Sequence, residues 1–226
     1  MTSIEHPRSA EVDAGTTPLV SVIMAAFNAE RFIAESCRSA LAQTYRRLEV
    51  IVVDDGSSDS TAEVVAALAR TDSRLRLIRQ ANLGVAAARN AAIAAASGEF
   101  VAPLDADDVW DSSKIARQVS RLLEAGPDTG LVYCWWVWMD VDNRVLDRSP
   151  RWRVEGRILQ RLIEINVTGS ASVPLFPVTT FVTPVFEGGS QGEPIPFTEF
   201  FQQASITEIS AQTTVAVPDG GTVLLG

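Results

Sequence analysis

Three carboxylates stand within four residues near the middle of the chain, in the motif Asp105-Ala106-Asp107-Asp108. The motif directly follows an apolar run over residues 100–104 that is typical of a buried strand. Carboxylate oxygens are the hard ligands that Mg²⁺ or Mn²⁺ prefers, and a metal held there could bridge to the oxygens of a diphosphate. Taken by itself the motif is short, and an acidic turn that caps the next helix is the more frequent explanation.

The acidic motif belongs to a longer alternation of two hydrophobic patterns. Short apolar runs rich in β-branched residues are typical of strands in a parallel sheet, and apolar residues three or four positions apart are typical of helices. These patterns predict strands over residues 19–25, 48–53, 75–78, 100–104 and 131–139, and helices after Asn28, after the capping box Ser60-Thr61-Ala62-Glu63, and over 85–96, 114–124 and 156–165. This order predicts an α/β fold whose mainly parallel sheet has helices on both faces and ligands at the carboxyl ends of its strands.

Three further loops follow strands of the same predicted sheet and are expected at the same edge. They are Ala26-Phe27-Asn28, Asp54-Asp55-Gly56-Ser57, and Asn82-Leu83-Gly84 with the nearby Ala88-Arg89-Asn90. In this order the four loops are far more specific than any single one. From about Val20 to Phe176 the sequence resembles the inverting family 2 glycosyltransferases, which have a nucleotide-sugar-binding fold of the glycosyltransferase A type. The resemblance is carried by Val-Val-Asp-Asp-Gly-Ser-Ser-Asp and Leu-Asp-Ala-Asp-Asp-Val-Trp.

The resemblance implies a reaction and a set of site residues. A sugar would pass from a nucleotide-sugar donor, with a UDP-sugar favoured, to an acceptor hydroxyl with inversion, assisted by Mg²⁺ or Mn²⁺. By position, the resemblance puts Ala25, Phe27 and Asp55 around the nucleobase, with Glu30 and Asp54 close by and Asn82 and Gly84 in the neighbouring loop. It puts Arg89 near the base or diphosphate and Asp105 at the ribose or donor sugar. Asp107 would be the principal metal ligand, beside Asp105. Simpler readings stay open for three positions: Asp55-Gly56 as a turn, Arg89 as a solvated helix residue, and Phe27 as a core residue.

The chain lacks an obvious residue for one step of that reaction. An inverting transferase needs a general base to take the proton of the acceptor hydroxyl. In the family that the sequence resembles, an acidic residue of a later Glu-Asp-type motif serves, but no Glu-Asp pair follows Phe176. The catalytic base is therefore left unassigned.

A cluster of tryptophans, Trp135, Trp136 and Trp138, allows two interpretations. Tryptophan rings can stack on sugars, but aromatic residues on a strand more often pack against the helices that cover it. The core interpretation is favoured.

The composition changes after Arg161. Residues 162–226 contain no Lys or Arg, and residues 178–186 and 206–217 show the partial period-two alternation of β-hairpins. Residues 212–226 resemble a strand-turn-strand fragment of bacterial secretins. These features predict a disordered leader (1–18), a nucleotide-sugar-binding domain with an incomplete acceptor side (19–176), and a poorly ordered β-rich tail (177–226) foreign to that domain, as in a chimeric or frameshifted reading frame.

The overall composition excludes several functions. The chain of 226 residues has a formal net charge of −9, which would repel nucleic acid. The single histidine, His6, lies in the polar leader, which leaves no histidine for a Ser-His-Asp triad or a His-rich metal site. The two cysteines, Cys37 and Cys134, stand in unrelated contexts and do not suggest a disulfide framework. No apolar run reaches the roughly 18 residues that a transmembrane helix needs. We expect a cytoplasmic protein, with a peripheral position at the inner membrane as the alternative.

Three functional hypotheses follow. The first is a metal-dependent inverting glycosyltransferase, whose acceptor could be a glycan, a lipid-linked sugar or a small molecule. The second is a catalytically incomplete remnant that binds the nucleotide sugar but lacks the base. The third is a nucleotidyltransferase, which also uses paired acids and a metal, although the glycine-rich, lysine-containing loop usual after its first strand is absent here.

Overall fold

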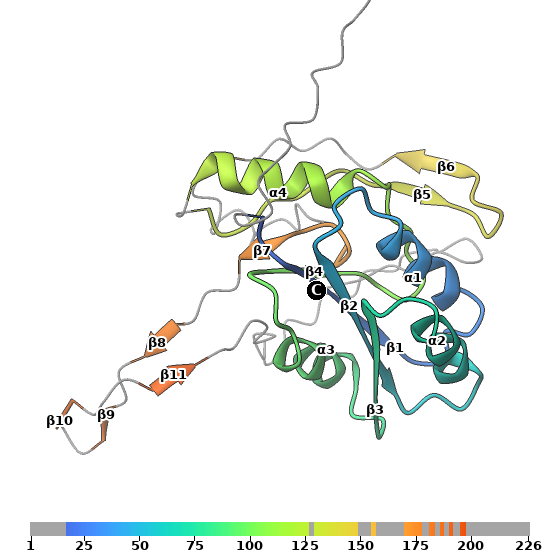
Figure 1. Cartoon of the computed structure of the whole chain (residues 1–226), viewed down its shortest axis with the longest axis horizontal. Coiled ribbons are helices and arrows are strands. Elements are labelled where there is room, and N and C mark those ends of the chain that lie inside the picture. The colour runs from blue at the N-terminus through green and yellow to red at the C-terminus, as the bar shows by residue number, and fades with distance from the viewer. Residues whose placement is uncertain are drawn as a thin grey trace, which may run out of the picture.

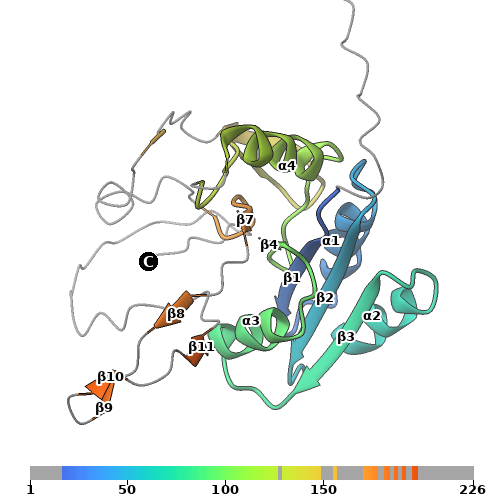
Figure 2. The same cartoon turned by 60° about the vertical axis from the view of Figure 1, so that its left-hand side comes forward.

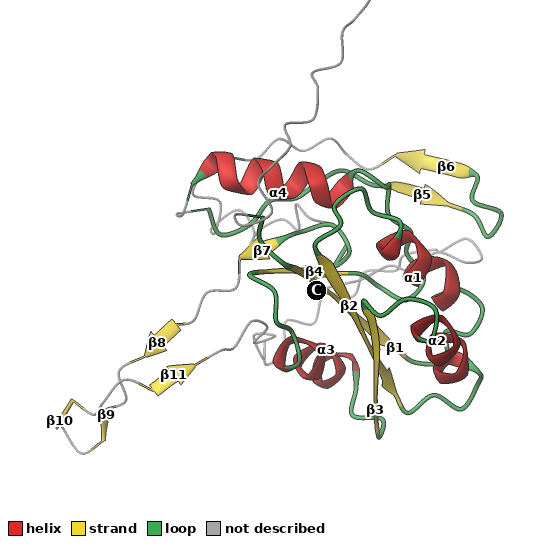
Figure 3. Cartoon of the chain, viewed as in Figure 1, coloured by secondary structure: helices red, strands yellow, loops and turns green. Residues whose placement is uncertain are grey.

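The computed structural model describes residues 17–126, 129–148, 155–156, 170–177, 181–183, 186–187, 190–191 and 195–197. The central part alternates strands and helices: β1 (Val20–Ala26), α1 (Ile33–Leu41), β2 (Leu48–Asp55), α2 (Thr61–Ala69), β3 (Leu75–Gln80), α3 (Val85–Ala94), β4 (Phe100–Pro103) and α4 (Lys114–Ala125). Short strands follow: β5 (Val137–Met139), β6 (Val145–Arg148), β7 (Phe176–Pro177), β8 (Phe181–Thr183), β9 (Phe186–Glu187), β10 (Ser190–Gln191) and β11 (Ile195–Phe197). Figure 3 shows this order of helices and strands.

The main sheet has five strands in the order β3-β2-β1-β4-β7. The pairs β1–β2, β1–β4 and β2–β3 are parallel, whereas β7 runs antiparallel to β4 with Phe176 opposite Val101. The predicted α/β fold with a mainly parallel sheet is therefore confirmed, and the carboxyl ends of β1, β2, β3 and β4 meet at one edge.

Helices cover both faces of the sheet because successive strand residues point to opposite sides. Val22 and Met24 of β1 are buried in a core with α1, α2 and α4, while Ile23 is buried with Ala88 and Ala92 of α3. Figures 1 and 2 show α3 on the opposite side of the strands from α1 and α2. Small alanine side chains on α3 let that helix approach the sheet closely.

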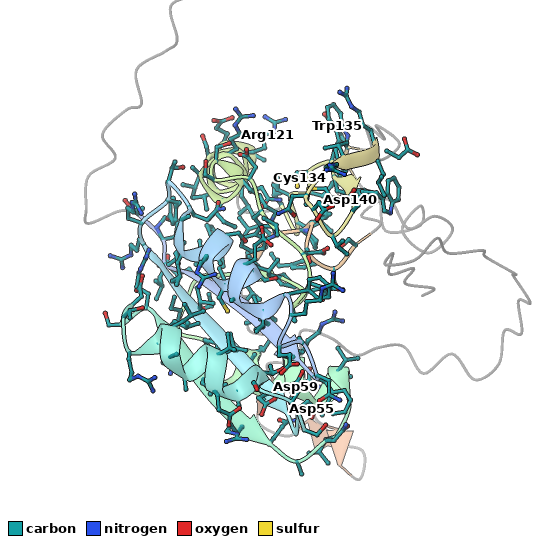
Figure 4. The ribbon with its side chains drawn as sticks, turned by 90° about the vertical axis from the view of Figure 1, so that its right-hand side faces the viewer. Asp55, Asp59, Arg121, Cys134, Trp135 and Asp140 are labelled. Atoms are coloured by element: carbon teal, nitrogen blue, oxygen red, sulfur yellow. The ribbon has the colours of Figure 1, made fainter. Side chains whose placement is uncertain are left out.

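The predicted strand over 131–139 is only partly correct. Val132 makes an isolated antiparallel bridge to Leu175, and β5 starts at Val137 and pairs with β6 in a separate two-stranded sheet. The core interpretation is wrong for Trp135 and Trp138, which are 44% and 40% exposed, and Figure 4 shows Trp135 at the outer edge of the molecule; Trp136 is half-buried. The physical reason is that all residues of β5 and β6 are exposed, so this hairpin offers no covered face on which a ring could be buried.

The tail is described in part. β8 pairs with β11 and β9 with β10, both antiparallel, as the β-hairpin pattern predicted for that stretch. The leader up to residue 16, the predicted helix 156–165 beyond Gly156, and the secretin-like residues 212–226 lie outside the described residues. Within the described part of the chain, no helix is long and apolar enough to cross a membrane.

Candidate nucleotide-sugar site

The loops after β1 and β2 are locked together by hydrogen bonds. The Asn28 amide donates to Ser57 Oγ at 3.0 Å, and the Ser58 amide donates to Asn28 Oδ1 at 2.9 Å. The Ala29 amide donates to Thr61 Oγ1 at 2.8 Å. Asn28 has a φ of 49°, a left-handed conformation that asparagine tolerates better than most residues. The first two loops at the sheet edge therefore form one rigid unit.

Glu30 and Asp59 extend this lock to the start of α2. The Glu30 amide donates to Asp59 Oδ2 at 3.1 Å, and the Ser60 amide donates to Glu30 Oε2 at 2.9 Å. The predicted capping box is wrong, because Ser60 makes no side-chain cap and Asp59 Oδ1 instead accepts the Thr61 amide at 3.0 Å. The carboxylate of the preceding residue, Asp59, takes the place of the expected Ser60 hydroxyl. Glu30 thus links the loop after β1 to the loop after β2.

Asp55 organises the loop after β3. Its carboxylate is 3% exposed and accepts bonds from Gln80 Nε2 at 2.7 Å, the Leu83 amide at 2.9 Å and the Gly84 amide at 2.8 Å. Burial alone would raise the pKa of Asp55, but these three hydrogen bonds outweigh it and hold the pKa below its ordinary value. The ionised carboxylate therefore shapes the loop that contains Asn82 and Gly84.

Asp54 is buried beside it. Its Oδ1 atom accepts the Ser57 amide at 3.2 Å, while Oδ2 lies 3.4 Å from Arg79 Nε and has no hydrogen-bond partner. The buried carboxylate is compensated by an arginine that is itself largely exposed. The Asp54 carboxylate thus points into the protein.

Gly56 brings the second and third loops into contact. Its φ is 74°, and an added Cβ would lie 2.8 Å from the Asn82 nitrogen. We predict that Gly56→Ala loses at least about 2 kcal/mol of unfolding free energy, because it combines a disfavoured φ with a backbone clash. Equilibrium unfolding in urea checks this, with Gly130→Ala, where an added Cβ meets nothing within 4 Å, as the matched control. Equal stability of the two variants would contradict it.

Arg89 and Asp105 join α3 to the acidic turn. Arg89 Nη2 lies 2.8 Å from Asp105 Oδ1, and the two side chains are 23% and 24% exposed. The solvated interpretation of Arg89 is therefore wrong. It failed because the partner follows a strand sixteen residues later, beyond the range of any helical pattern.

The acidic turn gathers negative charge. Asp107 is exposed, whereas Asp105 and Asp108 are half-buried. Burial raises the pKa of Asp108 above its ordinary value, and the charges of Asp105 and Asp107 raise it further, while hydrogen bonds from Ser172 and Ser170 oppose the rise. A divalent cation bound beside these carboxylates would reduce their mutual repulsion. Among the described residues, no group of three or more Asp, Glu, His or Cys side chains is placed to hold a metal ion, so any cation here would need ligands from outside the protein as well.

The first loop exposes an aromatic ring. Phe27 is 51% exposed, so the core interpretation of Phe27 is wrong, whereas Ala25 is half-buried in β1. Sequence reasoning missed two residues of this edge, Gln80 and Ser172. Gln80 lies two residues after the predicted strand 75–78, which β3 extends, whereas Ser172 accepts the Asp105 amide from 67 residues away, beyond the range of a local pattern.

A mainly parallel sheet, with acidic loops interlocked at its carboxyl edge, defines the class of α/β domain that has the glycosyltransferase A type fold. Residues 21–173 match the family model described as Glycosyl transferase family 2. The chain belongs to this family.

Two curated relatives from Escherichia coli are named by their reaction. The UDP-Glc:alpha-D-GlcNAc-diphosphoundecaprenol beta-1,3-glucosyltransferase WfgD is 46% identical over 107 residues, which cover 47% of this chain and 42% of WfgD. WfaP, named for the same reaction, is 41% identical over 102 residues, which cover 45% of this chain and 40% of WfaP. The chain thus spans less than half the length of these relatives.

Two solved structures are similar as well. The mannosyltransferase PcManGT from Pyrobaculum calidifontis, in complex with GDP-Man and Mn²⁺, has a TM-score of 0.54 and 26% identity, covering 77% of this chain and 48% of that one. S. aureus TarS 1-349 in complex with UDP has a TM-score of 0.56 and 26% identity, covering 70% of this chain and 46% of that one. These likenesses agree with the α/β architecture.

Proposed function

We propose that this protein binds a nucleotide sugar together with Mg²⁺ or Mn²⁺ and contributes the donor half of an inverting sugar transfer. The observation that carries the proposal is the convergence of four loops at one sheet edge. Asp55 holds the loop after β3 at one side of this edge, and the Asp105–Asp108 turn forms the other side. Among the similar proteins, one is named as a UDP-Glc transferase, one structure contains UDP and another contains GDP-Man, so a UDP-sugar is the first donor to test.

The acidic turn is the proposed metal site. Asp107, which is exposed, would be the principal ligand and Asp105 the second. Metal sites that also contact substrate phosphates commonly use one or two protein carboxylates, with phosphate oxygens and water as the other ligands. Bound there, the cation would neutralise the charge of the departing nucleoside diphosphate. Arg89, already 2.8 Å from Asp105, is the nearby cation proposed to contact the diphosphate.

The nucleobase is proposed to lie over the first two loops. Phe27 offers an exposed ring against which a base could stack, and Ala25 leaves room beside it. Asp55 would meet the base through a remaining lone pair on Oδ2, which within the described part of the chain accepts the Gly84 amide alone. Glu30, Asp54 and Asn82 would act by fixing these loops.

Transfer itself requires the acceptor hydroxyl to attack the anomeric carbon as the nucleoside diphosphate leaves. A base must take the hydroxyl proton, and we assign none. The alternative proposal is therefore a remnant that binds the donor without turnover. If turnover occurs, a diphosphoundecaprenol-linked sugar is the first acceptor to test, because WfgD and WfaP are named for one.

Calorimetric titration of the full chain with UDP-glucose, UDP-GlcNAc and GDP-mannose, each with Mn²⁺ or EDTA, tests the proposal. We expect at least one of these to bind about tenfold more tightly with Mn²⁺. Absence of binding by all three in Mn²⁺ would overturn the donor-site proposal. Sugar transfer by the same preparation would favour the transferase over the remnant.

A further inference from the structure

The acidic turn is held by a segment far from it in the sequence. The Asp105 amide donates to Ser172 Oγ at 2.8 Å, and Ser170 Oγ donates to Asp108 Oδ2 at 3.1 Å. The Ser172 amide in turn donates to Ser170 Oγ at 3.1 Å. Two linked serines therefore contact the first and the last residue of the turn.

Ser172 is itself held firmly. It is 5% exposed, and its carbonyl oxygen accepts Trp110 Nε1 at 2.9 Å. The next carbonyl, that of Val173, accepts Gln118 Nε2 from α4 at 2.8 Å. Because the neighbouring main chain is anchored to the core on α4, the Ser172 hydroxyl is a fixed point against which the acidic turn is set.

The same segment borders the space next to Arg89. A small pocket of about 40 Å³ is lined by Arg89, Pro103, Ala171 and Pro174. Ala171 and Pro174 flank Ser172 in the sequence, so this segment contacts the acidic turn with its hydroxyls and forms part of the wall beside Arg89. A shift of this segment would therefore affect both Arg89 and Asp105, the two partners of the ion pair.

We propose that Ser172 is a positioning residue for the cation–diphosphate site: its hydroxyl fixes the main chain at Asp105 and so directs the carboxylates of Asp105 and Asp107. This inference rests on the proposed donor function. Residues that orient metal ligands from outside the coordination shell typically change metal affinity by about 10- to 100-fold. Ser170 contributes less, because it contacts only the far end of the turn.

Hydrogen exchange in the ligand-free protein tests the local claim. In Ser172→Ala the Asp105 amide loses its acceptor, and we expect it to exchange at least about tenfold faster than in wild type. Ser120→Ala is the matched control, since it removes a serine hydroxyl that bonds Glu124 on the exposed side of α4 at 2.8 Å. Ser172→Thr, which keeps the hydroxyl, should restore slow exchange. Wild-type exchange in Ser172→Ala would overturn the inference.

Nucleotide titration tests the functional claim. In Ser172→Ala we expect the Mn²⁺-supported gain in affinity to fall about tenfold while affinity in EDTA stays as in wild type, because the loops after β1 and β2 do not depend on this serine. A merely structural loss would weaken both affinities alike, and that result, or an undiminished Mn²⁺ gain, would overturn the inference. If Mn²⁺ does not raise the nucleotide affinity of wild type, the metal proposal is wrong. Hydrogen exchange of the Asp105 amide would still decide whether Ser172 holds the acidic turn. If Ser172→Ala folds poorly, Ser170→Ala is measured in its place. We expect it to lose a smaller part of the Mn²⁺-supported gain in affinity.

Discussion

Asp107→Asn is expected to abolish the Mn²⁺-supported binding of a sugar nucleotide while leaving the fold intact. The substitution keeps the size of the side chain but removes the charge of the proposed principal metal ligand. Because the charge of Asp107 raises the pKa of Asp108, its removal relieves repulsion in the acidic turn. The ligand-free variant should therefore be at least as stable as wild type.

Thermal unfolding gives the expected size of this effect. A ligand at about 100 times its Kd stabilises a protein by about 2.7 kcal/mol, which for a domain of this size corresponds to roughly 5–10 °C in Tm. Wild type should show this shift with Mn²⁺ and the nucleotide sugar, and Asp107→Asn should show none. Asp142→Asn, the same chemical change on the exposed hairpin between β5 and β6, is the matched control. A full shift in Asp107→Asn would rule out Asp107 as a required ligand.

A second large effect is expected at Lys114, the only lysine of the chain. Its side chain is buried at the start of α4, with Nζ 4.0 Å from the Trp110 ring centroid and 2.8 Å from Gln118 Oε1. Burial lowers the pKa of Lys114 from 10.5 to about 8, and the neighbouring Cys134 opposes this only weakly. The ammonium is thus held in the core at a cost in free energy.

This shift predicts how stability depends on pH. Between about pH 8 and 10.5 the unfolded lysine still holds its proton while the folded one has lost it, so the unfolded state binds more protons and stability rises with pH. The full increment is about 3 kcal/mol, since one pKa unit corresponds to about 1.4 kcal/mol. Below pH 8 both states are protonated and Lys114 adds no pH dependence.

Lys114→Met isolates that increment. Burial raises the pKa of Cys37 to about 12, which makes stability fall with rising pH above the ordinary cysteine value and masks part of the lysine effect in wild type. The difference between wild type and Lys114→Met, followed by urea unfolding from pH 7 to 10.5, removes this common contribution. We expect wild type to gain about 3 kcal/mol relative to the variant across this range. Parallel curves would show that the lysine titrates normally, and an NMR titration of the single lysine provides an independent check.

Local patterns in the sequence were enough for the layers of the fold. The apolar runs of β1, β2 and β4 can be recognised from neighbouring residues alone, and so can the helical spacing of α4. The parallel sheet, and the acidic loops at its carboxyl edge, could therefore be predicted. The family resemblance was confirmed over residues 21–173. The same method failed for Trp135 and Trp138, because a pattern that predicts a strand does not say whether another layer covers it.

The acidic motif shows how much of the candidate site local sequence patterns can predict. Its residue types and its place after β4 predicted carboxylates at the carboxyl edge, and the structure has them there. Which atoms hold those carboxylates was decided only by tertiary structure: Arg89 on Asp105, Ser172 on the Asp105 amide, and the Leu83 and Gly84 amides on Asp55. Hydrogen bonds require approach within about 3 Å, and residues this far apart in the chain come so close only when the sheet brings their loops together. The sequence by itself determined which residues stand at the edge; packing determined what each of them touches.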